Sequence, residues 1–489
     1  MNFKFGSLAI AVLLIAACSE APVSPEQQFI DDVAAALGGK ANIEAVNTVI
    51  VEGEGYMQNV GQDMTPTSTG LRFAISDYRF KADLNTGSSR TEQTRTPEFE
   101  YFRGPDPITQ IFGIDGDVAY TIAPDGSARR APQTVATEQR STFYHHPVPL
   151  LRATLLGSTT VGNVRTEGGL ALADFTTGEG NSLTMAVDST TGLPAYIRST
   201  DHHVYLRDVT RTTRFSNYAA NGELTVPTML SIDLDEFHLV SLKLTSQVPN
   251  ADVGDLSAPS AAAATTPFTG AAPANVTAEA VAEGVWFLAG QSHHSVLIEF
   301  SDHLMVVEAP NEARALAVET KAAELFPDKP IRYLVNTHHH FDHSGGIRTA
   351  VSQEQTIVTH AANEEFFRRM AEQPSSIVPD AQSGHPQAIS IEIVDDARTY
   401  ADDSMTVEIY HIADNPHSSS MLMIYLPAQR LIIEADAFTP NPGRPQKFSP
   451  NLLDNILRLE LEVDRIVPIH GAIGDFAELE AHVQGLRGE

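Results

Sequence analysis

Residues 337–346 read Thr-His-His-His-Phe-Asp-His-Ser-Gly-Gly, and this stretch decides how the second half of the chain is interpreted. It follows an apolar segment typical of a strand and precedes a segment typical of a helix. It therefore lies at the carboxyl end of a strand, where α/β proteins build their sites. In an extended chain His338 and His340 point to the same side and can hold one cation together. Where the chain turns toward the helix, Asp342 and His343 take a neighbouring position and can hold a second cation.

A short histidine tract can also be an adventitious metal binder or a solvated loop. Here Asp342 is interleaved with the histidines, and the pair Gly345-Gly346 permits a tight turn and a close backbone approach. The pattern His338-x-His340-x-Asp342-His343 resembles the signature of the metallo-β-lactamase-fold hydrolases. That resemblance covers about residues 280 to 475 and implies an α/β fold of the αββα type.

The resemblance implies three further metal ligands, each at the end of a later strand. His417 precedes an apolar strand and corresponds to the third histidine of the first metal site. Asp436 ends an apolar segment and corresponds to the carboxylate that bridges both metals, and His470 in Pro-Ile-His-Gly corresponds to a second-site histidine. The complete set of predicted metal ligands is His338, His340, Asp342, His343, His417, Asp436 and His470.

Two positions depart from the family pattern, although neither is a ligand. Ala435 stands where family members usually carry glycine, and Glu308 stands where many carry aspartate. Other histidines in this half are ambiguous, because each of them either lines the cleft or is structural or solvated. They are His293, His294, His339 and His411.

The predicted chemistry follows from the charges that such a site would hold. Two divalent cations on neutral imidazoles and two carboxylates leave a net positive site, which lowers the pKa of a bridging water and yields a hydroxide nucleophile. Asp342 is the predicted catalytic residue, because it can orient that nucleophile while ligating a metal. Cys18 is the only cysteine, so the ligands in the folded body are nitrogen and oxygen. Such a set suits zinc, with iron or manganese as alternatives.

The substrate class is predicted from the residues around Asp436. One major group of β-lactamases carries a cysteine there, followed shortly by a lysine that holds the substrate carboxylate. Residues 437–439 carry no cation, and the nearest basic residues are Arg444 and Lys447. The site therefore resembles the glyoxalase- and lactonase-like members, which implies hydrolysis of an ester, thioester, lactone or related acyl bond in a small-molecule substrate. The alternatives are β-lactamase activity and, from another class, a lipid-handling or envelope-assembly lipoprotein.

Residues 1–18 have the features of an export signal. Lys4 supplies a positive charge, and Leu8 to Ala17 form an apolar run that is too short to span a bilayer. The segment Ile-Ala-Ala-Cys that ends at Cys18 resembles the lipobox of bacterial lipoproteins, so we expect a lipid anchor on Cys18 that holds the protein to a membrane. Ser19 favours the outer membrane, facing the periplasm or the cell surface. Ordinary export with a chance cysteine is the alternative.

The rest of the chain divides into two predicted domains and a linker. Residues 20–254 contain short β-segments separated by turn signals and predict a large antiparallel sheet with little helix. The start of this region resembles the half-barrels of lipoprotein carriers. Residues 255–274 are rich in alanine, proline, serine and threonine and predict a linker, and residues 275–489 form the predicted hydrolase domain. Because the linker offers little to pack, we expect the two domains to fold independently.

The composition narrows the possible partners. The formal net charge is −30 at pH 7, and an acidic surface repels phosphate backbones, which argues against nucleic-acid binding. With 42% hydrophobic and 19% charged residues, the chain is typical of a globular protein rather than a disordered one.

Overall fold

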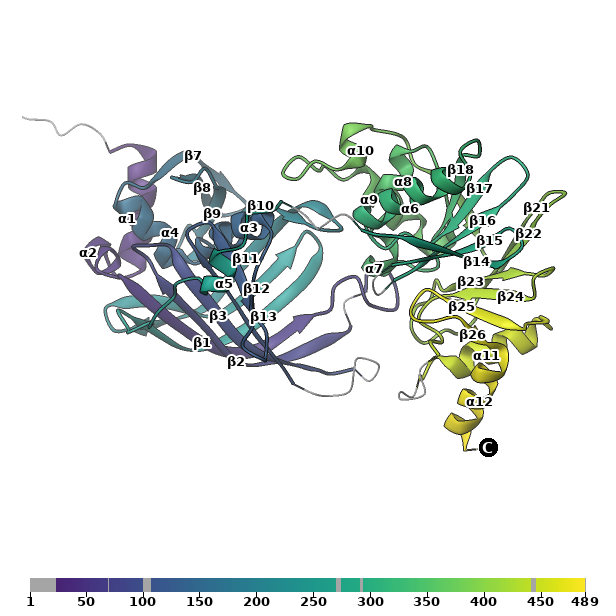
Figure 1. Ribbon diagram of the computed structural model, residues 1–489. Helices are drawn as coiled ribbons and strands as arrows, with labels where there is room; N and C mark the ends of the chain where they lie inside the picture. Colours follow the sequence, from purple (N-terminus) through teal and green to yellow (C-terminus); the bar gives the residue numbers. More distant parts are fainter. Residues whose placement is uncertain are drawn as a thin grey trace, which may run out of the picture.

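The computed structural model describes residues 23–68, 70–99, 107–269, 274–290, 293–440 and 446–488. The predicted signal segment at residues 1–18, with Cys18, lies outside these ranges. Among the described residues no helix combines the length and the apolar character needed to cross a membrane. Figure 1 shows two β-rich parts side by side, with the N-terminal part in purple to teal and the C-terminal part in green to yellow.

The N-terminal part is built on one antiparallel sheet, whose strand order is β6-β5-β4-β3-β2-β1-β13-β12-β11-β10-β9-β8-β7. The first and last strands pair at the middle of this sheet, so the chain ends the sheet beside where it began. The strands are β1 (Thr48–Gln58), β2 (Arg72–Asp83), β3 (Ser88–Pro97), β4 (Ile108–Asp115), β5 (Val118–Ile122), β6 (Ala128–Arg130), β7 (Thr159–Glu167), β8 (Leu170–Thr177), β9 (Ser182–Asp188), β10 (Pro194–His203), β11 (Arg207–Asn221), β12 (Leu224–Leu234) and β13 (Phe237–Pro249).

Helices cover part of this sheet and bury an apolar core against it. Phe29 and Val33 of the first helix lie in one cluster with Leu151 of the fourth helix and with Phe175 and Met185 of the sheet. The helices are α1 (Pro25–Ala36), α2 (Lys40–Glu44), α3 (Gln133–Phe143), α4 (Pro147–Leu155) and α5 (Ser260–Ala263). The sheet confirms the prediction of a β-rich N-terminal region. The expectation of little helix missed α3 and α4, which are both short; α4 also contains two prolines, which weaken a helix signal.

The C-terminal part contains two sheets that pack face to face. The first has the order β14-β15-β16-β17-β18-β19-β20, and the second has the order β21-β22-β23-β24-β25-β26. The strands of the first sheet are β14 (Thr277–Ala282), β15 (Val285–Ala289), β16 (Ser295–Glu299), β17 (Leu304–Val307), β18 (Ile331–Val335), β19 (Thr356–His360) and β20 (Ser390–Val394). Those of the second sheet are β21 (Ala397–Ala401), β22 (Thr406–His411), β23 (Leu422–Leu426), β24 (Leu431–Glu434), β25 (Arg465–Pro468) and β26 (Gly474–Asp475).

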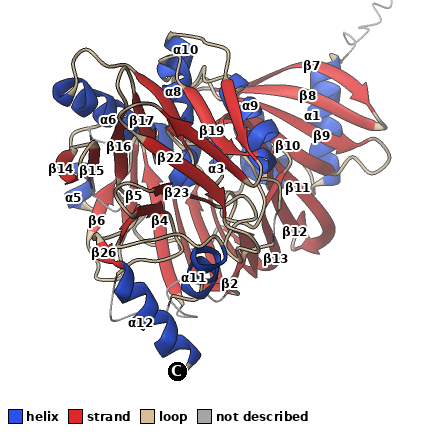
Figure 2. Ribbon diagram, turned by 90° about the vertical axis from the view of Figure 1, so that its right-hand side faces the viewer, coloured by secondary structure: helices blue, strands red, loops and turns tan. Residues whose placement is uncertain are grey.

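Helices cover the outer face of each sheet, so the C-terminal part has four layers. Val296 and Ile298 of the first sheet share the central core with Ile424 and Ile433 of the second. Figure 2 shows α11 and α12 on the opposite side of the strands from α6, α8 and α9. This arrangement confirms the predicted αββα fold. The helices are α6 (Glu312–Leu325), α7 (Phe341–Ser344), α8 (Ile347–Ser352), α9 (Glu364–Glu372), α10 (Ala381–Gly384), α11 (Ser449–Arg458) and α12 (Phe476–Arg487), with a 3-10 turn at Ala361–Asn363.

The two parts are packed together, which the composition of residues 255–274 did not predict. Leu234 and Phe237 of the N-terminal sheet belong to the same apolar cluster as Phe366 of α9. The described residues of the predicted linker also lie against the N-terminal part, because the Phe268 carbonyl accepts a hydrogen bond from Gln133 N–H at 2.7 Å. The two parts thus share apolar surface, and their independent folding stays a prediction.

Candidate metal centre

The candidate site begins where β18 ends. Asn336 N–H donates to the Val358 carbonyl of β19 at 2.9 Å, and the Thr337 carbonyl accepts from Leu422 N–H of β23 at 2.8 Å. The Asn336 side-chain amide donates to the His343 carbonyl at 3.1 Å and closes the loop. The histidine-rich loop is therefore held by hydrogen bonds to a strand of each sheet.

One group of possible ligand atoms comes from three loops at this edge. Each member offers one atom within 4.8 Å of the others, and its histidines are buried. The loop before β23 is fixed by Asn415, whose side-chain oxygen accepts His417 N–H at 2.9 Å. The members of this group are His338, His340, His417 and Asp436.

A second group lies beside the first and also has its ligand atoms within 4.8 Å of one another. His293, whose role the sequence left open, belongs to it, with Nε2 3.1 Å from Oδ2 of Asp342. The backbone N–H of His294 donates to the Ile469 carbonyl at 2.9 Å, which brings the loop after β15 to the end of β25. The members are His293, Asp342, His343 and His470.

Asp436 lies between the two groups. Its Oδ2 is 3.0 Å from Nε2 of His343 and 3.0 Å from Nε2 of His417, and its Oδ1 is 3.0 Å from Nε2 of His470. All seven predicted ligands thus lie in one of the two groups, while their binding of metal stays a prediction. The one member that was not among the predicted ligands is His293. Its position in the short connection between two apolar strands, β15 and β16, is the signal that could have found it.

The turn after β24 presents Asp436 in an unusual backbone conformation, with φ of 59°. The buried Glu434 carboxyl accepts the N–H groups of Ala437 and Phe438 at 3.0 and 3.2 Å and holds this turn closed. Burial raises the pKa of Glu434 to about 8. Ala435, in place of the usual glycine, fits because its side chain is buried in the core between the sheets.

Glu308 lies behind the histidine-rich loop and contacts two of its residues. Its fully buried carboxylate accepts Thr337 N–H at 2.6 Å with one oxygen. The other oxygen lies 3.1 Å from Nδ1 of His343, so Nδ1 donates to Glu308 and Nε2 is directed toward Asp436. Glu308 therefore sets both the tautomer and the orientation of the His343 ring.

The protonation of the first group fits metal ligation. Nε2 of His340 lies 2.9 Å from the backbone oxygen of Asp63, so Nε2 donates and Nδ1 keeps its lone pair. Among the described residues this buried Nδ1 has no hydrogen-bond partner. Burial and the neighbouring histidines lower the pKa of His338 and His340 well below the usual value, which keeps both rings neutral. A neutral imidazole with a buried lone pair fits a metal ligand.

The second group lies in a field that favours positive charge. Burial alone would lower the pKa of His343, but the carboxylates of Asp436, Glu308 and Asp342 raise it well above its usual value. Burial also opposes the charged form of Asp342, yet His343 and the hydrogen bonds from His293 and Gln62 hold its pKa below the usual value. A divalent cation bound here would replace the proton that these carboxylates draw to His343, because metal binding releases protons from its ligands.

The remaining histidines of uncertain role are tied into the structure. His339 is buried beside Ser420, and burial lowers its pKa to about 4. Nδ1 of His294 accepts from Gly290 N–H at 3.2 Å, and Nε2 of His411 lies 3.0 Å from the Ser419 carbonyl. None of these three side chains belongs to either ligand group.

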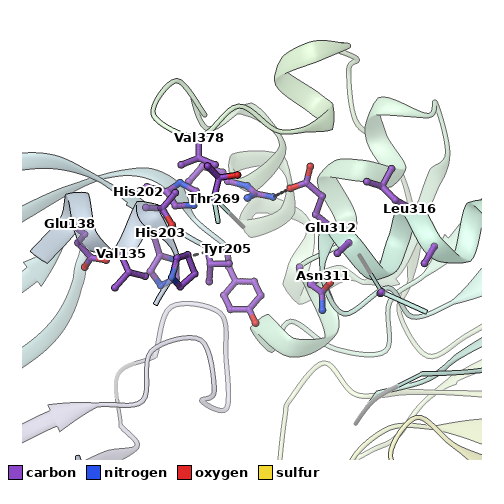
Figure 3. Close-up of a pocket in the computed structure, with 18 of the residues that line it drawn as sticks. Val135, Glu138, His202, His203, Tyr205, Thr269, Asn311, Glu312, Leu316 and Val378 are labelled. Atoms are coloured by element: carbon purple, nitrogen blue, oxygen red, sulfur yellow. Dashed lines mark hydrogen bonds and ion pairs between the residues drawn. The ribbon is translucent and has the colours of Figure 1, made fainter. Parts of the chain in front are cut away.

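A separate cavity of about 1140 Å³ lies between the two parts of the chain. Figure 3 shows His203 and Tyr205 of the N-terminal part on one side and Asn311 and Glu312 on the other. No member of either ligand group lines it. The Tyr205 ring stacks on Phe341 with centroids 5.0 Å apart, so this cavity lies behind α7.

A comparison with protein families finds a match in the C-terminal part of the chain. The profile of the metallo-beta-lactamase superfamily matches residues 289–470. No functionally curated protein matches the chain significantly. Solved structures that resemble it include the metallo-beta-lactamase FIM-1 from Pseudomonas aeruginosa in its mono-zinc form, with 19% identity, 44% of this chain and 96% of that chain covered, and a TM-score of 0.34.

Two further solved structures have the same TM-score of 0.34. The metallo-beta-lactamase from Pontibacter korlensis has 17% identity and covers 44% of this chain and 100% of its own. The rubredoxin oxygen:oxidoreductase from Desulfovibrio gigas has 16% identity and covers 42% of this chain and 60% of its own. The matched residues 289–470 contain both ligand groups and form a metallo-beta-lactamase superfamily domain, which indicates a metal-dependent hydrolase.

Proposed function

We propose that this domain binds two divalent metal ions, of which zinc suits the ligands best, and hydrolyses an ester, thioester, lactone or related acyl bond. The observation that carries the dinuclear proposal is the position of Asp436. Its two carboxylate oxygens lie 3.0 Å from histidines of both ligand groups, His417 on one side and His470 on the other. A carboxylate in that position can serve two ions at once.

The residues of the site would divide the work. When bound, two such ions lower the pKa of a water between them and polarise the carbonyl oxygen of a substrate. Asp342, whose pKa lies below its usual value, is ionised at neutral pH and can accept a hydrogen bond from that water. The imidazoles of His338 and His340 stay neutral and can serve as ligands instead of holding protons.

The acyl substrate class is supported by the residues directly after Asp436. Ala437 and Phe438 are buried in the core beneath α11, so neither position offers a cation to a substrate carboxylate. Arg444 falls outside the described residues. A β-lactam would bring its carboxylate to a site already rich in carboxylates, where an unpaired charge binds weakly.

The test uses the purified full chain. We expect close to two metal ions per chain by elemental analysis, and Asp436→Ala should lower that number. We also expect kcat/KM to be higher for an aryl ester, a thioester or a lactone than for a chromogenic cephalosporin. One ion or none in the wild type would refute the dinuclear proposal. A tenfold preference for the cephalosporin, about 1.4 kcal/mol of transition-state stabilisation, would make β-lactamase activity the function instead.

We further propose that the enzyme works outside the cytoplasm, tethered by a lipid on Cys18. The support is the apolar run Leu8 to Ala17 and the small residues directly before the cysteine. Cys18→Ala should move the protein out of the membrane fraction. If the fractions stay unchanged and the wild-type N-terminus carries no lipid mass, the anchor does not exist.

A further inference from the structure

The loop between β1 and β2 crosses from the N-terminal part to the metal centre. We call residues 59–68 the β1–β2 arm. We propose that this arm completes the metal centre by orienting one ligand of each group, His340 through the Asp63 carbonyl and Asp342 through Gln62. The proposal rests on the proposed dinuclear site. It makes the N-terminal part a component of the active centre rather than a separate domain.

The first contact fixes a ligand of the first group. The Asp63 carbonyl accepts from Nε2 of His340 at 2.9 Å, and both residues are buried. Because Nε2 donates there, the lone pair of His340 is on Nδ1, a buried atom that has no hydrogen-bond partner among the described residues. Hydrogen bonds of this kind hold the tautomer and the ring orientation of metal-binding histidines. Here the acceptor comes from a residue 277 positions earlier in the chain.

The second contact fixes a ligand of the second group. The Gln62 side-chain amide donates to Oδ1 of Asp342 at 2.6 Å. The other oxygen, Oδ2, lies 3.1 Å from Nε2 of His293. Gln62 therefore binds one carboxylate oxygen of Asp342, while the other oxygen stays directed toward His293 of the second ligand group. Gln62 is a positioning residue, because it acts through Asp342.

The arm is itself held in shape and docked on the site. The Asp63 carboxylate accepts the N–H groups of Met64, at 2.7 Å, and of Gly70. The Met64 carbonyl accepts Ser419 N–H and the Ser419 hydroxyl, each at 2.9 Å. Ser419 lies two residues after His417, so the arm touches the loop that carries another predicted ligand. The arm is therefore fixed both by hydrogen bonds within its own turn and by hydrogen bonds to the loop that carries His417.

The close approach of the arm depends on Gly61. This residue is buried with φ of +74°, and its carbonyl accepts Phe341 N–H at 3.2 Å. A Cβ at this position would collide with the Phe341 ring, so an alanine would push the arm away from α7. Gly87, in the turn between β2 and β3, has nearly the same φ of +73° with open space around its Cβ. Gly87→Ala is therefore a matched control for backbone strain without the collision.

The experiment measures metal binding in the full chain rather than turnover alone. The variants are Gln62→Ala, Gly61→Ala and the control Gly87→Ala. Dissociation constants are measured by competition with a chelator, and cobalt(II) is used as a probe whose visible absorption reports ligand geometry. We expect Gln62→Ala to raise the dissociation constant of one of the two ions ten- to hundredfold, as the loss of such supporting hydrogen bonds does elsewhere. Gly61→Ala should lower the affinity for both ions and change the cobalt spectrum. Gly87→Ala should match the wild type in both measurements.

The outcomes separate this inference from the proposed function. If the wild type holds fewer than two ions, the proposed dinuclear site fails whatever the variants do. If the wild type holds two ions and both arm variants keep its affinities and cobalt spectrum, the arm is only a packing contact and the inference is wrong. Should Gly61→Ala not fold, as judged by circular dichroism, Gln62→Ala decides alone, because its side chain is only half-buried.

Discussion

The buried carboxylate of Glu308 shows what a single side chain contributes at this site. It receives two donors at once, Thr337 N–H at 2.6 Å and Nδ1 of His343 at 3.1 Å. It does so from a left-handed backbone conformation, with φ of 67°, which costs energy in a residue other than glycine. Such a conformation persists where the surrounding contacts over-determine it, and here they connect the end of β17 to the ligand loop.

At this scale we predict that Glu308→Gln weakens metal binding by ten- to hundredfold. Glutamine has one side-chain acceptor for two donors, so either Thr337 N–H or His343 Nδ1–H faces an amide hydrogen. Glu308→Asp keeps the charge and should lose less. The measurement is chelator competition on the full chain, with Glu480→Gln on the exposed surface of α12 as the control. Equal affinities for Glu308→Gln and this control would contradict the role assigned to Glu308.

Among the secondary-structure elements, α6 shows how local sequence signals determine a helix. It spans Glu312–Leu325 and begins after Asn311, which caps the first turn by accepting Arg314 N–H at 2.9 Å. Ala315, Val318 and Ala322 repeat at helical spacing and are buried against the first sheet. Glu319 lies next to this apolar stripe and accepts a hydrogen bond from Gln355 at 2.8 Å.

The partial burial of Glu319 predicts a pH dependence for this element. Burial raises its pKa from 4.5 to about 7, so the folded protein binds this proton more tightly than the unfolded chain does. The free energy of unfolding should therefore fall as the pH rises from about 4.5 to about 7, by roughly 2 kcal/mol after allowance for solvent screening. Glu319→Gln should remove this part of the slope and be more stable than the wild type at pH 8. Urea unfolding at several pH values tests this, and parallel curves for the two proteins would contradict it.

Across the whole molecule, a buried cluster of charges connects the two parts. The Asp380 carboxylate lies 3.0 Å from Arg207 of β11 and 2.5 Å from Arg348 of α8, and all three side chains are nearly inaccessible to solvent. A second pair across the same interface, Arg369 and Glu236, is about half exposed. Removing a partner from a buried pair leaves an uncompensated charge, whereas an exposed pair contributes little.

We predict that Asp380→Asn lowers the free energy of unfolding by about 3 kcal/mol. Glu236→Gln is the matched control within the same interface, and it should lower the free energy by no more than about 1 kcal/mol. The measurement is the urea midpoint of each full-length protein. Similar midpoints for the two variants would show that the buried cluster does not hold the parts together.

The sequence alone predicted those features whose signals are local. The alternation of strand and helix signals beyond residue 275 predicted a layered α/β fold, and the resemblance carried by residues 338–343 implied the αββα type. The spacing of His338, His340, Asp342 and His343 needed only the geometry of one strand and one turn. His417, Asp436 and His470 were added through the family resemblance, and the structure places each of them in one of the two ligand groups.

Only the tertiary structure showed how the two parts meet at this edge. His293 joins the second group because Ile469 anchors the loop beside it, a contact between residues far apart in the chain. Asp63 acts through its backbone carbonyl, which every residue type possesses, so no letter of the sequence marks it. In the sequence, the apolar residues at the interface between the two parts look the same as ordinary core residues of each sheet. Such contacts depend on chain segments that come together only on folding, whereas local periodicity reports on neighbours within a few residues.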